Sequence, residues 1–324
     1  DNTIYNVTID ISANDSTNLT RLDISSAIHE YIDTNNFQTL LDKNAVKFHI
    51  NIASGPTTIP DYAFSHLDTI IFNNIVDIQI PSGVTAIGNY AFGHDHKIDA
   101  EQYYTYSKSP YKQSSELPRK LDIDYNKLFT DVPTFKAPFI NSIILPDTLT
   151  SIGEGAFCNN IYLTNIILPE SLETFGEKSF YGCWNLESMT IPNSVSNIDD
   201  RAFEKCISLT DLTFVRDNNS LTSLPTRMFF NCISLSNIYF NNISIDSIPV
   251  ECFFNCKSLQ KLEIIGVDDE GDEIKISNRL PDNVTIIHKS AFSYCAKMPN
   301  LEFPTNLEKI QMNAFKNCRK LIFN

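Results

Sequence analysis

The chain has 324 residues, of which 42% are hydrophobic, and a formal net charge of −14. The apolar content is sufficient for a large core. The acidic balance and the lack of a Lys/Arg cluster argue against nucleic acid and anionic membrane surfaces as partners, because both are bound through basic patches. No apolar run approaches the roughly 20 residues of a membrane helix, so we expect no membrane insertion within this chain.

Residues 1–52 are predicted to form a strand, a helix and a second strand. The sequence at 4–11 is typical of a strand, and residues 46–52 alternate between apolar and polar side chains, which predicts the first strand of a larger sheet. Between them, apolar residues at roughly helical spacing indicate a helix; these are Leu19, Leu22, Ile24, Ile28, Tyr31 and Ile32. The periodicity that marks the rest of the chain is absent from this segment.

A phenylalanine recurs along residues 53–324, each time with an apolar residue five positions before it. The nine members are Phe64, Phe92, Phe157, Phe180, Phe203, Phe229, Phe253, Phe292 and Phe315. Phe157, Phe180 and Phe203 are 23 residues apart. A fixed period in the twenties indicates a solenoid whose coils share one core. We therefore expect about nine repeats of 23 residues at 53–324, and we interpret residues 1–52 as an N-terminal cap, with a separate binding module as the alternative.

The unit at 163–186 shows what each repeat contributes. Residues 166–168 alternate inward and outward and predict a short strand, which Pro169 ends because proline cannot donate a ladder hydrogen bond. Leu172 and Phe175 form a second inward row. The small Ser179 then precedes Phe180, so that the backbones of neighbouring coils can approach while the ring fills the space between them.

Six of the eight cysteines lie three residues after a repeat phenylalanine. They are Cys183, Cys206, Cys232, Cys256, Cys295 and Cys318. Equivalent positions in adjacent coils stack at about 4.7–4.9 Å, so we interpret this set as a buried column of reduced thiols, although distance alone would also permit disulfides between neighbours. No pair has the CxxC spacing of a zinc or redox site.

The repeat pattern LxxIx(L/I)PxxLxxIgxxAFxxCxxL resembles the BspA-like leucine-rich repeats. Its clearest copies are ILPDTLTSIGEGAF at 144–157, MTIPNSVSNIDDRAFEKCISL at 189–209 and LEFPTNLEKIQMNAFKNCRKL at 301–321. The resemblance implies an α/β-type, right-handed solenoid with a parallel sheet along one face. It also implies a role in adhesion or recognition, since this family is found mainly in surface proteins of bacteria and some protozoan parasites. It brings no catalytic motif.

Two insertions interrupt the period. The first, at about 94–139, is polar and rich in tyrosine, and loops inserted into a rigid scaffold often carry function. Its candidate contact residues are Tyr103, Tyr104, Tyr106 and Tyr111; the alternative is a loop folded over the flank of the solenoid. The second, at about 265–280, predicts a hairpin around an acidic turn that lacks the spacing of a calcium loop.

The outward positions of the predicted sheet form a second candidate surface. Most of them are small and polar, but Ile144 and Ile167 form an apolar centre and Tyr239 adds one aromatic ring. Solenoids commonly bind protein ligands through such an extended face, while the alternative is a face that is simply solvated. The lack of a Trp, Tyr and Arg cluster on this face argues against a strong hot spot there.

The sequence offers no catalytic constellation, cofactor motif or second cluster to complete a metal site with His94 and His96. We therefore predict a non-enzymatic, secreted or cell-surface protein that binds another protein, such as a host matrix component or receptor. The alternative is a structural spacer or a self-associating stalk. That alternative rests on the end of the sequence at Asn324, where the next strand should begin without a closing cap: either further residues follow in the native protein, or the exposed strand edges pair between molecules.

Overall fold

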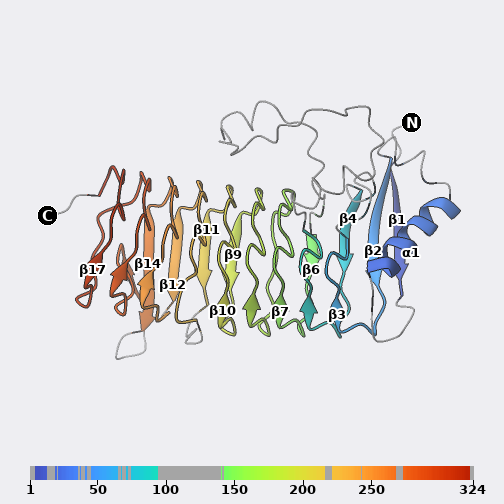
Figure 1. Ribbon diagram of the computed structural model, residues 1–324, viewed down its shortest axis with the longest axis horizontal. Helices are drawn as coiled ribbons and strands as arrows, with labels where there is room; N and C mark the ends of the chain where they lie inside the picture. Colours follow the sequence, from blue (N-terminus) through green and yellow to red (C-terminus); the bar gives the residue numbers. More distant parts are fainter. Residues whose placement is uncertain are drawn as a thin grey trace, which may run out of the picture.

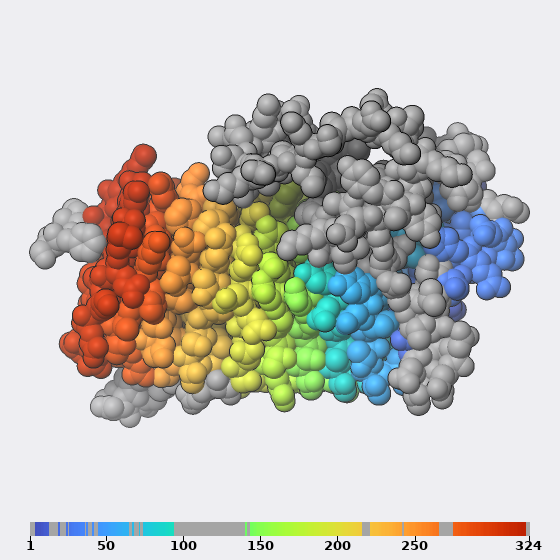
Figure 2. Space-filling view, viewed as in Figure 1, coloured from blue at the N-terminus to red at the C-terminus, as the bar shows by residue number. Residues whose placement is uncertain are grey.

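The chain forms an elongated stack of coils, with the β1–α1–β2 segment at one end and β17 at the other (Figure 1). In the space-filling view, neighbouring coils of the stack pack directly against each other (Figure 2). The computed structural model describes residues 4–12, 19, 21–35, 37, 41, 45–64, 67, 71, 74–93, 140, 142–215, 221–241, 243–267 and 273–321.

The N-terminal segment is a strand, a helix and a strand, as predicted. Strand β1 (Tyr5–Ile11) pairs in parallel with β2 (Val46–Ile52), and α1 (Arg21–Thr34) connects them. Ile24, Ile28 and Ile32 of α1 and the apolar positions of β2 are buried, and Tyr31 is partly buried. One expectation was wrong: β2 is the second strand of the sheet and not the first, because β1 occupies the edge position.

The longer strands of successive coils pair in register and in parallel, which gives the sheet orders β1-β2-β4-β6 and β9-β11-β12-β14. Their buried positions are mostly the alternate apolar residues that the pattern predicted, and Glu263 of β14, at an outward position, is buried as well. The additional strands are β4 (Ile75–Gln79), β6 (Ser142–Ile144), β9 (Ser188–Ile191), β11 (Asp211–Phe214), β12 (Asn237–Asn241) and β14 (Lys261–Val267).

A second row of two-residue strands forms where the pattern placed its second inward position. These strands also pair in parallel, in the orders β3-β5-β7-β8-β10 and β13-β16-β17. Each ends on the apolar residue that lies five positions before a repeat phenylalanine. They are β3 (Thr58–Ile59), β5 (Ala86–Ile87), β7 (Ser151–Ile152), β8 (Thr174–Phe175), β10 (Asn197–Ile198), β13 (Ser247–Ile248), β16 (Ile286–Ile287) and β17 (Lys309–Ile310).

The strand predicted at residues 166–168 does not form. Ile166 and Leu168 are buried and Ile167 is 79% exposed, so the alternation is present. Within the described residues, however, residues 164–168 take no part in a ladder, and Thr164 O accepts one backbone hydrogen bond from Glu187 N at 3.1 Å. The main sheet is therefore split between β6 and β9, since alternation of burial does not by itself bring two backbones to pairing distance.

The repeat phenylalanines form a continuous stack of nine rings, which confirms the periodic core. Consecutive ring centroids lie 5.0–5.7 Å apart with nearly parallel planes. The first eight rings are fully buried and Phe315, in the last coil, is partly buried. Aromatic pairs in offset stacks contribute beyond their buried area, so this column couples each coil to the next.

The predicted column of reduced thiols is also present. All eight cysteines are free and buried. Each of the six column cysteines donates its S–H to the carbonyl oxygen of the phenylalanine in the preceding coil, at 3.0–3.2 Å. Burial raises the pKa of the Cys206 thiol well above its ordinary value and that of Cys318 to about 11. The thiols are thus structural donors held in the protonated, unreactive form.

The second insertion forms the predicted hairpin. Strand β15 (Glu273–Ser277) pairs antiparallel with β14, and the acidic turn at 268–272 lies outside the described residues. Beyond the hairpin, Arg279 and Glu302 form a single parallel bridge. One antiparallel strand therefore takes a place in an otherwise parallel sheet.

Candidate interaction surfaces

The outward face of the main sheet carries two of the predicted contact residues in prominent positions. Ile144 is 67% exposed and Ile167 is 79% exposed, and they belong to neighbouring coils. The third, Tyr239, is partly buried, and the Lys261 ammonium lies 5.1 Å from its ring centroid. The predicted tyrosines Tyr103, Tyr104, Tyr106 and Tyr111 lie outside the described residues.

Polar pairs occupy the rest of this sheet face. His49 Nδ1 lies 2.6 Å from Asp77 Oδ2 across β2 and β4. Asn237 donates a hydrogen bond to Asp211 at 2.7 Å across β12 and β11. The sheet face is thus largely satisfied by pairs between adjacent strands, which leaves the two isoleucines as its apolar contact points.

Hydrogen bonds also fix the C-terminal part of the sheet face. The Glu263 carboxylate accepts from the Lys261 ammonium at 2.7 Å and from the Ser277 hydroxyl at 3.4 Å. Glu263 is only 4% exposed. The hydrogen bond from Lys261 to Glu263 raises the pKa of Lys261, which favours its charged form.

A different surface arises at the turns around the repeat phenylalanines. The residues two positions before and two positions after the ring adopt left-handed backbone conformations in most coils, with φ between 51° and 70°. Non-glycine residues rarely adopt this conformation. It is stabilised here by backbone hydrogen bonds to the next coil, as from Arg201 N to Thr226 O and from Lys205 N to Phe230 O.

These turns place a cluster of charged and aromatic side chains on five consecutive coils. We call it the turn ridge; its members are Tyr181, Arg201, Glu204, Lys205, Arg227, Phe230, Glu251, Phe254 and Tyr294. The turn ridge was not predicted from the sequence. The signal that could have found it is the position relative to the repeat phenylalanine, since every member lies two before, one after or two after that residue.

Glu204 is the centre of the turn ridge. It is 1% exposed, and its carboxylate accepts hydrogen bonds from Arg201 Nε at 2.8 Å and from Arg227 Nε and Nη2 at 3.0 and 3.1 Å. Arg227 Nη1 also bonds Glu251 at 3.1 Å. The hydrogen bond from Arg201 to Glu204 raises the pKa of Arg201. A buried carboxylate is thereby compensated by two guanidinium groups from successive coils.

Aromatic rings flank this charge cluster on both sides. The Arg201 guanidinium lies 5.9 Å from the Tyr181 ring, and Lys205 donates a hydrogen bond to the Tyr181 hydroxyl. The Arg227 guanidinium lies 3.7 Å from the Phe230 ring. Phe230 stacks on Phe254 at 4.7 Å, and Phe254 contacts Tyr294 at 5.2 Å.

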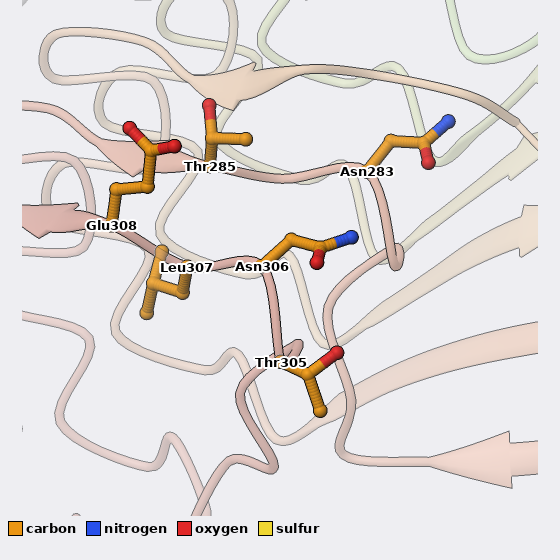
Figure 3. Close-up of a pocket in the computed structure, with 6 residues that line it drawn as sticks. All are labelled: Asn283, Thr285, Thr305, Asn306, Leu307 and Glu308. Atoms are coloured by element: carbon orange, nitrogen blue, oxygen red, sulfur yellow. The ribbon is translucent and has the colours of Figure 1, made fainter.

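A shallow, open groove of about 540 Å³ lies between the last two coils (Figure 3). Asn283 and Thr285 line one side, and residues 305–308 line the other. In earlier coils, a Ser at the position of Asn306 bonds a carbonyl of the preceding coil, as Ser194 does with Leu172 O at 2.6 Å. The groove brings together one carboxylate, Glu308, with amide and hydroxyl side chains. It is a surface depression that is open to solvent.

The part of the chain that the structure describes contains neither a metal-binding cluster nor a membrane-spanning helix. No group of three or more His, Cys, Asp or Glu side chains there could hold a metal ion. No helix among those residues is long and apolar enough to cross a membrane. His94, His96 and the acidic residues at 268–272 lie outside the described residues.

Comparison with known families bears directly on the repeats. The family described as "BspA type Leucine rich repeat region" matches the chain in six copies. They lie within residues 8–99, 133–260 and 273–323, which is more than half of the chain. The chain belongs to this family. The match begins at residue 8 and so includes most of the segment interpreted as a cap, and the boundary at residue 52 stays a prediction.

Solved structures of bacterial leucine-rich repeat proteins are also similar to the chain. A leucine rich repeat protein of T. pallidum is 20% identical over 65% of this chain and 77% of its own, with a TM-score of 0.43. A leucine rich cell surface protein of Faecalibacterium prausnitzii is 21% identical over 87% and 80%, with a TM-score of 0.40. A leucine-rich repeat protein of Eubacterium ventriosum is 16% identical over 90% and 87%, with a TM-score of 0.45. A search of curated protein sequences found no match.

Proposed function

We propose that the chain is a secreted or cell-surface recognition protein that binds another protein through the outward face of its main sheet. The observation that carries this proposal is the exposure of Ile144 and Ile167 on neighbouring coils. Ile144 is the only exposed large apolar residue in strands β2, β4, β6, β9, β11 and β12 as described, and Ile167 lies in the coil between β6 and β9. Exposed apolar side chains flanked by polar ones are typical of contact surfaces.

Membership in the BspA-type family supports the finer parts of this proposal. They are a right-handed solenoid of about nine repeats, an extracellular or surface location, and adhesion to a host matrix component or receptor. The N-terminal cap at 1–52 is a separate part of the proposal and rests on the strand–helix–strand order of that segment. We propose no catalytic role, because the family pattern brings no catalytic motif.

The test is a surface-binding panel of purified matrix proteins, receptor ectodomains and host glycans. We would compare the intact chain with the double variant I144S/I167S and with a variant in which residues 94–139 are replaced by a short turn. Loss of protein binding in I144S/I167S, with unchanged thermal stability, is the expected result. Loss only in the shortened variant would move recognition to the insertion, and no binding by any protein would remove the proposal.

A second candidate function is self-association through the last coil. Ile310 is 45% exposed and Met312 is 66% exposed, whereas Ile287, the equivalent of Ile310 one coil earlier, is fully buried. Ile287 lies opposite Ile310 in the β16–β17 ladder. Such a surface favours end-to-end contact between molecules.

The double variant I310S/M312S tests this second candidate and serves as the matched control for I144S/I167S. Light scattering over a range of protein concentrations would measure the mass of each variant. If the last coil mediates association, the intact chain gains mass with concentration and I310S/M312S does not. A monomer at every concentration removes this candidate.

A further inference from the structure

The turn ridge is not required by the repeat. The position directly after the repeat phenylalanine carries a different residue in almost every coil: Gly93, Cys158, Tyr181, Glu204, Phe230, Phe254, Ser293 and Lys316. The fold accepts small, charged and aromatic residues at this position. The gathering of arginines and aromatic rings on neighbouring coils is therefore a property of this region and not of the coil geometry.

The buried Glu204 carboxylate fixes the positions of the arginines of the turn ridge. A buried carboxylate loses its hydration and needs compensating partners. Arg201 and Arg227 provide them while keeping 34% and 30% of their side chains exposed. Two long and flexible side chains are thus fixed at the surface before any partner arrives, which lowers the entropy lost on binding.

Arg201 is the group that is best prepared for a ligand. Its Nε atom bonds Glu204, while its two terminal nitrogens donate to no atom of the described residues. Arg227, by contrast, uses Nε, Nη1 and Nη2 on Glu204 and Glu251. The free edge of the Arg201 guanidinium has the planar geometry that binds a carboxylate through two parallel hydrogen bonds.

The charges around Arg201 favour an anionic group over a cationic one. Lys178, Arg201 and Arg227 occupy the same position in three successive coils, and Lys205 lies beside them. Like charges on neighbouring coils repel each other, so this column of cations needs local compensation. Glu177, Glu204 and Glu251 offset most of its charge, which leaves a local excess that fits single carboxylates better than a densely sulfated polymer.

Aromatic side chains provide an apolar surface next to this charge. Phe230, Phe254 and Tyr294 form a row across three coils, and Tyr294 is 37% exposed. Phenylalanine, tyrosine and arginine are enriched in the centres of protein interfaces. Phe230 stacks on Phe254 and lies beneath Arg227, so these rings offer edges more than open faces, which suits an apolar side chain better than the flat face of a sugar ring.

We propose that the turn ridge is a second binding surface, which takes a protein segment that carries a carboxylate next to an apolar side chain. The carboxylate pairs with the free edge of Arg201, and the apolar side chain lies on the rings of Phe230, Phe254 and Tyr294. The proposal rests on the proposed function only in that the chain binds proteins. It concerns different residues from the sheet face, so the two surfaces can be tested separately.

The experiment selects peptides from a phage library of random 12-residue sequences on the immobilised chain. We expect the enriched peptides to contain Asp or Glu next to Phe, Leu, Ile or Tyr. Their binding should weaken about ten- to hundredfold in Arg201→Gln, the range for loss of a charged hydrogen-bonded pair. Arg201→Lys, which keeps the charge but not the planar fork, should recover only part of the binding.

Matched controls separate this result from misfolding and from the sheet face. Arg319→Gln removes an exposed arginine elsewhere and should change nothing, and I144S/I167S should leave these peptides bound. Thermal melting checks that Arg201→Gln folds, as expected because Arg227 still bonds Glu204. Enriched peptides without carboxylates, or equal binding by Arg201→Gln, would overturn the proposal. Tighter binding of a heparin oligosaccharide that is lost in Arg201→Gln would replace it with a sulfated glycan.

Discussion

Phe203 and Glu204 are adjacent in the chain but belong to two regions built by different rules. Phe203 lies in the inward column, where every coil carries the same residue, and its ring stacks between Phe180 and Phe229 at 5.4 and 5.7 Å. Glu204 lies in the outward turn column, where the residue changes from coil to coil, and its carboxylate binds arginines of two coils. The contrast separates what the fold needs from what one region of the surface adds.

The physical reason is the environment that each column meets. An inward side chain contacts the coil before it and the coil after it, and since these coils are alike, one residue type suits all positions. An outward side chain contacts solvent and whichever neighbours are present. Positions that carry the same residue in every coil therefore serve the stability of the stack. Positions that differ from coil to coil carry side chains that the fold does not require.

Alkaline pH should disturb the inward region most strongly. Burial raises the pKa of the column thiols above the ordinary value of 9.0. Their contribution to stability is therefore complete below about pH 9 and is lost as the pH rises through the folded-state values. Each thiol should lose about 1.4 kcal/mol per pH unit in this range, which over several thiols sums to several kcal/mol.

Urea unfolding under reducing conditions at pH 8, 9 and 10 would measure this loss. Cys232→Ala removes one thiol from the column and should make the dependence on pH shallower. A free energy of unfolding that stays constant to pH 10 would show that the thiols are not held protonated by burial.

Removal of one ring from the inward stack should have the next largest effect. Phe203→Ala is expected to lower the free energy of unfolding by about 3–5 kcal/mol, because it leaves a cavity between two coils. The matched control is Phe315→Ala in the last coil, which should cost less because Phe315 is only partly buried whereas Phe203 is fully buried. Equal losses at the two positions in chemical unfolding would contradict a stack whose stability is shared between coils.

The outward region offers a substitution that keeps shape and removes charge. Glu204→Gln should lower the free energy of unfolding by about 1.5–3 kcal/mol, since it weakens hydrogen bonds between charged groups and leaves two arginines without their buried counter-ion. Because Glu204 is buried, high salt should not abolish the difference. Glu302→Gln, on a 64% exposed carboxylate bound to Arg279, is the control and should change stability little.

A smaller effect of opposite sign, a gain in stability, is expected at the one position of the thiol column that is occupied by an asparagine. Asn160 occupies the cysteine position in the coil of Phe157; it is fully buried, and neither polar atom of its side-chain amide has a hydrogen-bond partner among the described residues. Asn160→Cys should raise the free energy of unfolding by about 1–2 kcal/mol, because it removes unsatisfied polar atoms. Asn159→Cys, at the neighbouring position, should bring no such gain, and a loss in Asn160→Cys would show that the amide serves another purpose.

Much of the inward region could be predicted because it depends on local periodicity. The spacing of Phe157, Phe180 and Phe203 is enough to set the coil length, and the position of Cys206 relative to Phe203 is enough to place the thiol column. The alternation around Ile144 and Ile167 likewise gave their outward orientation. These features follow from one coil contacting a copy of itself, so the repeat pattern by itself determines them.

The tertiary structure alone decided the features that depend on how two particular coils meet. Residues 166–168 alternate correctly yet form no strand, because pairing depends on the distance between neighbouring backbones. The burial of Glu204 depends on Arg201 in its own coil and on Arg227 in the next. Glu204 and Arg227 are 23 residues apart in the chain, and it is the stacking of the two coils that brings them to hydrogen-bonding distance.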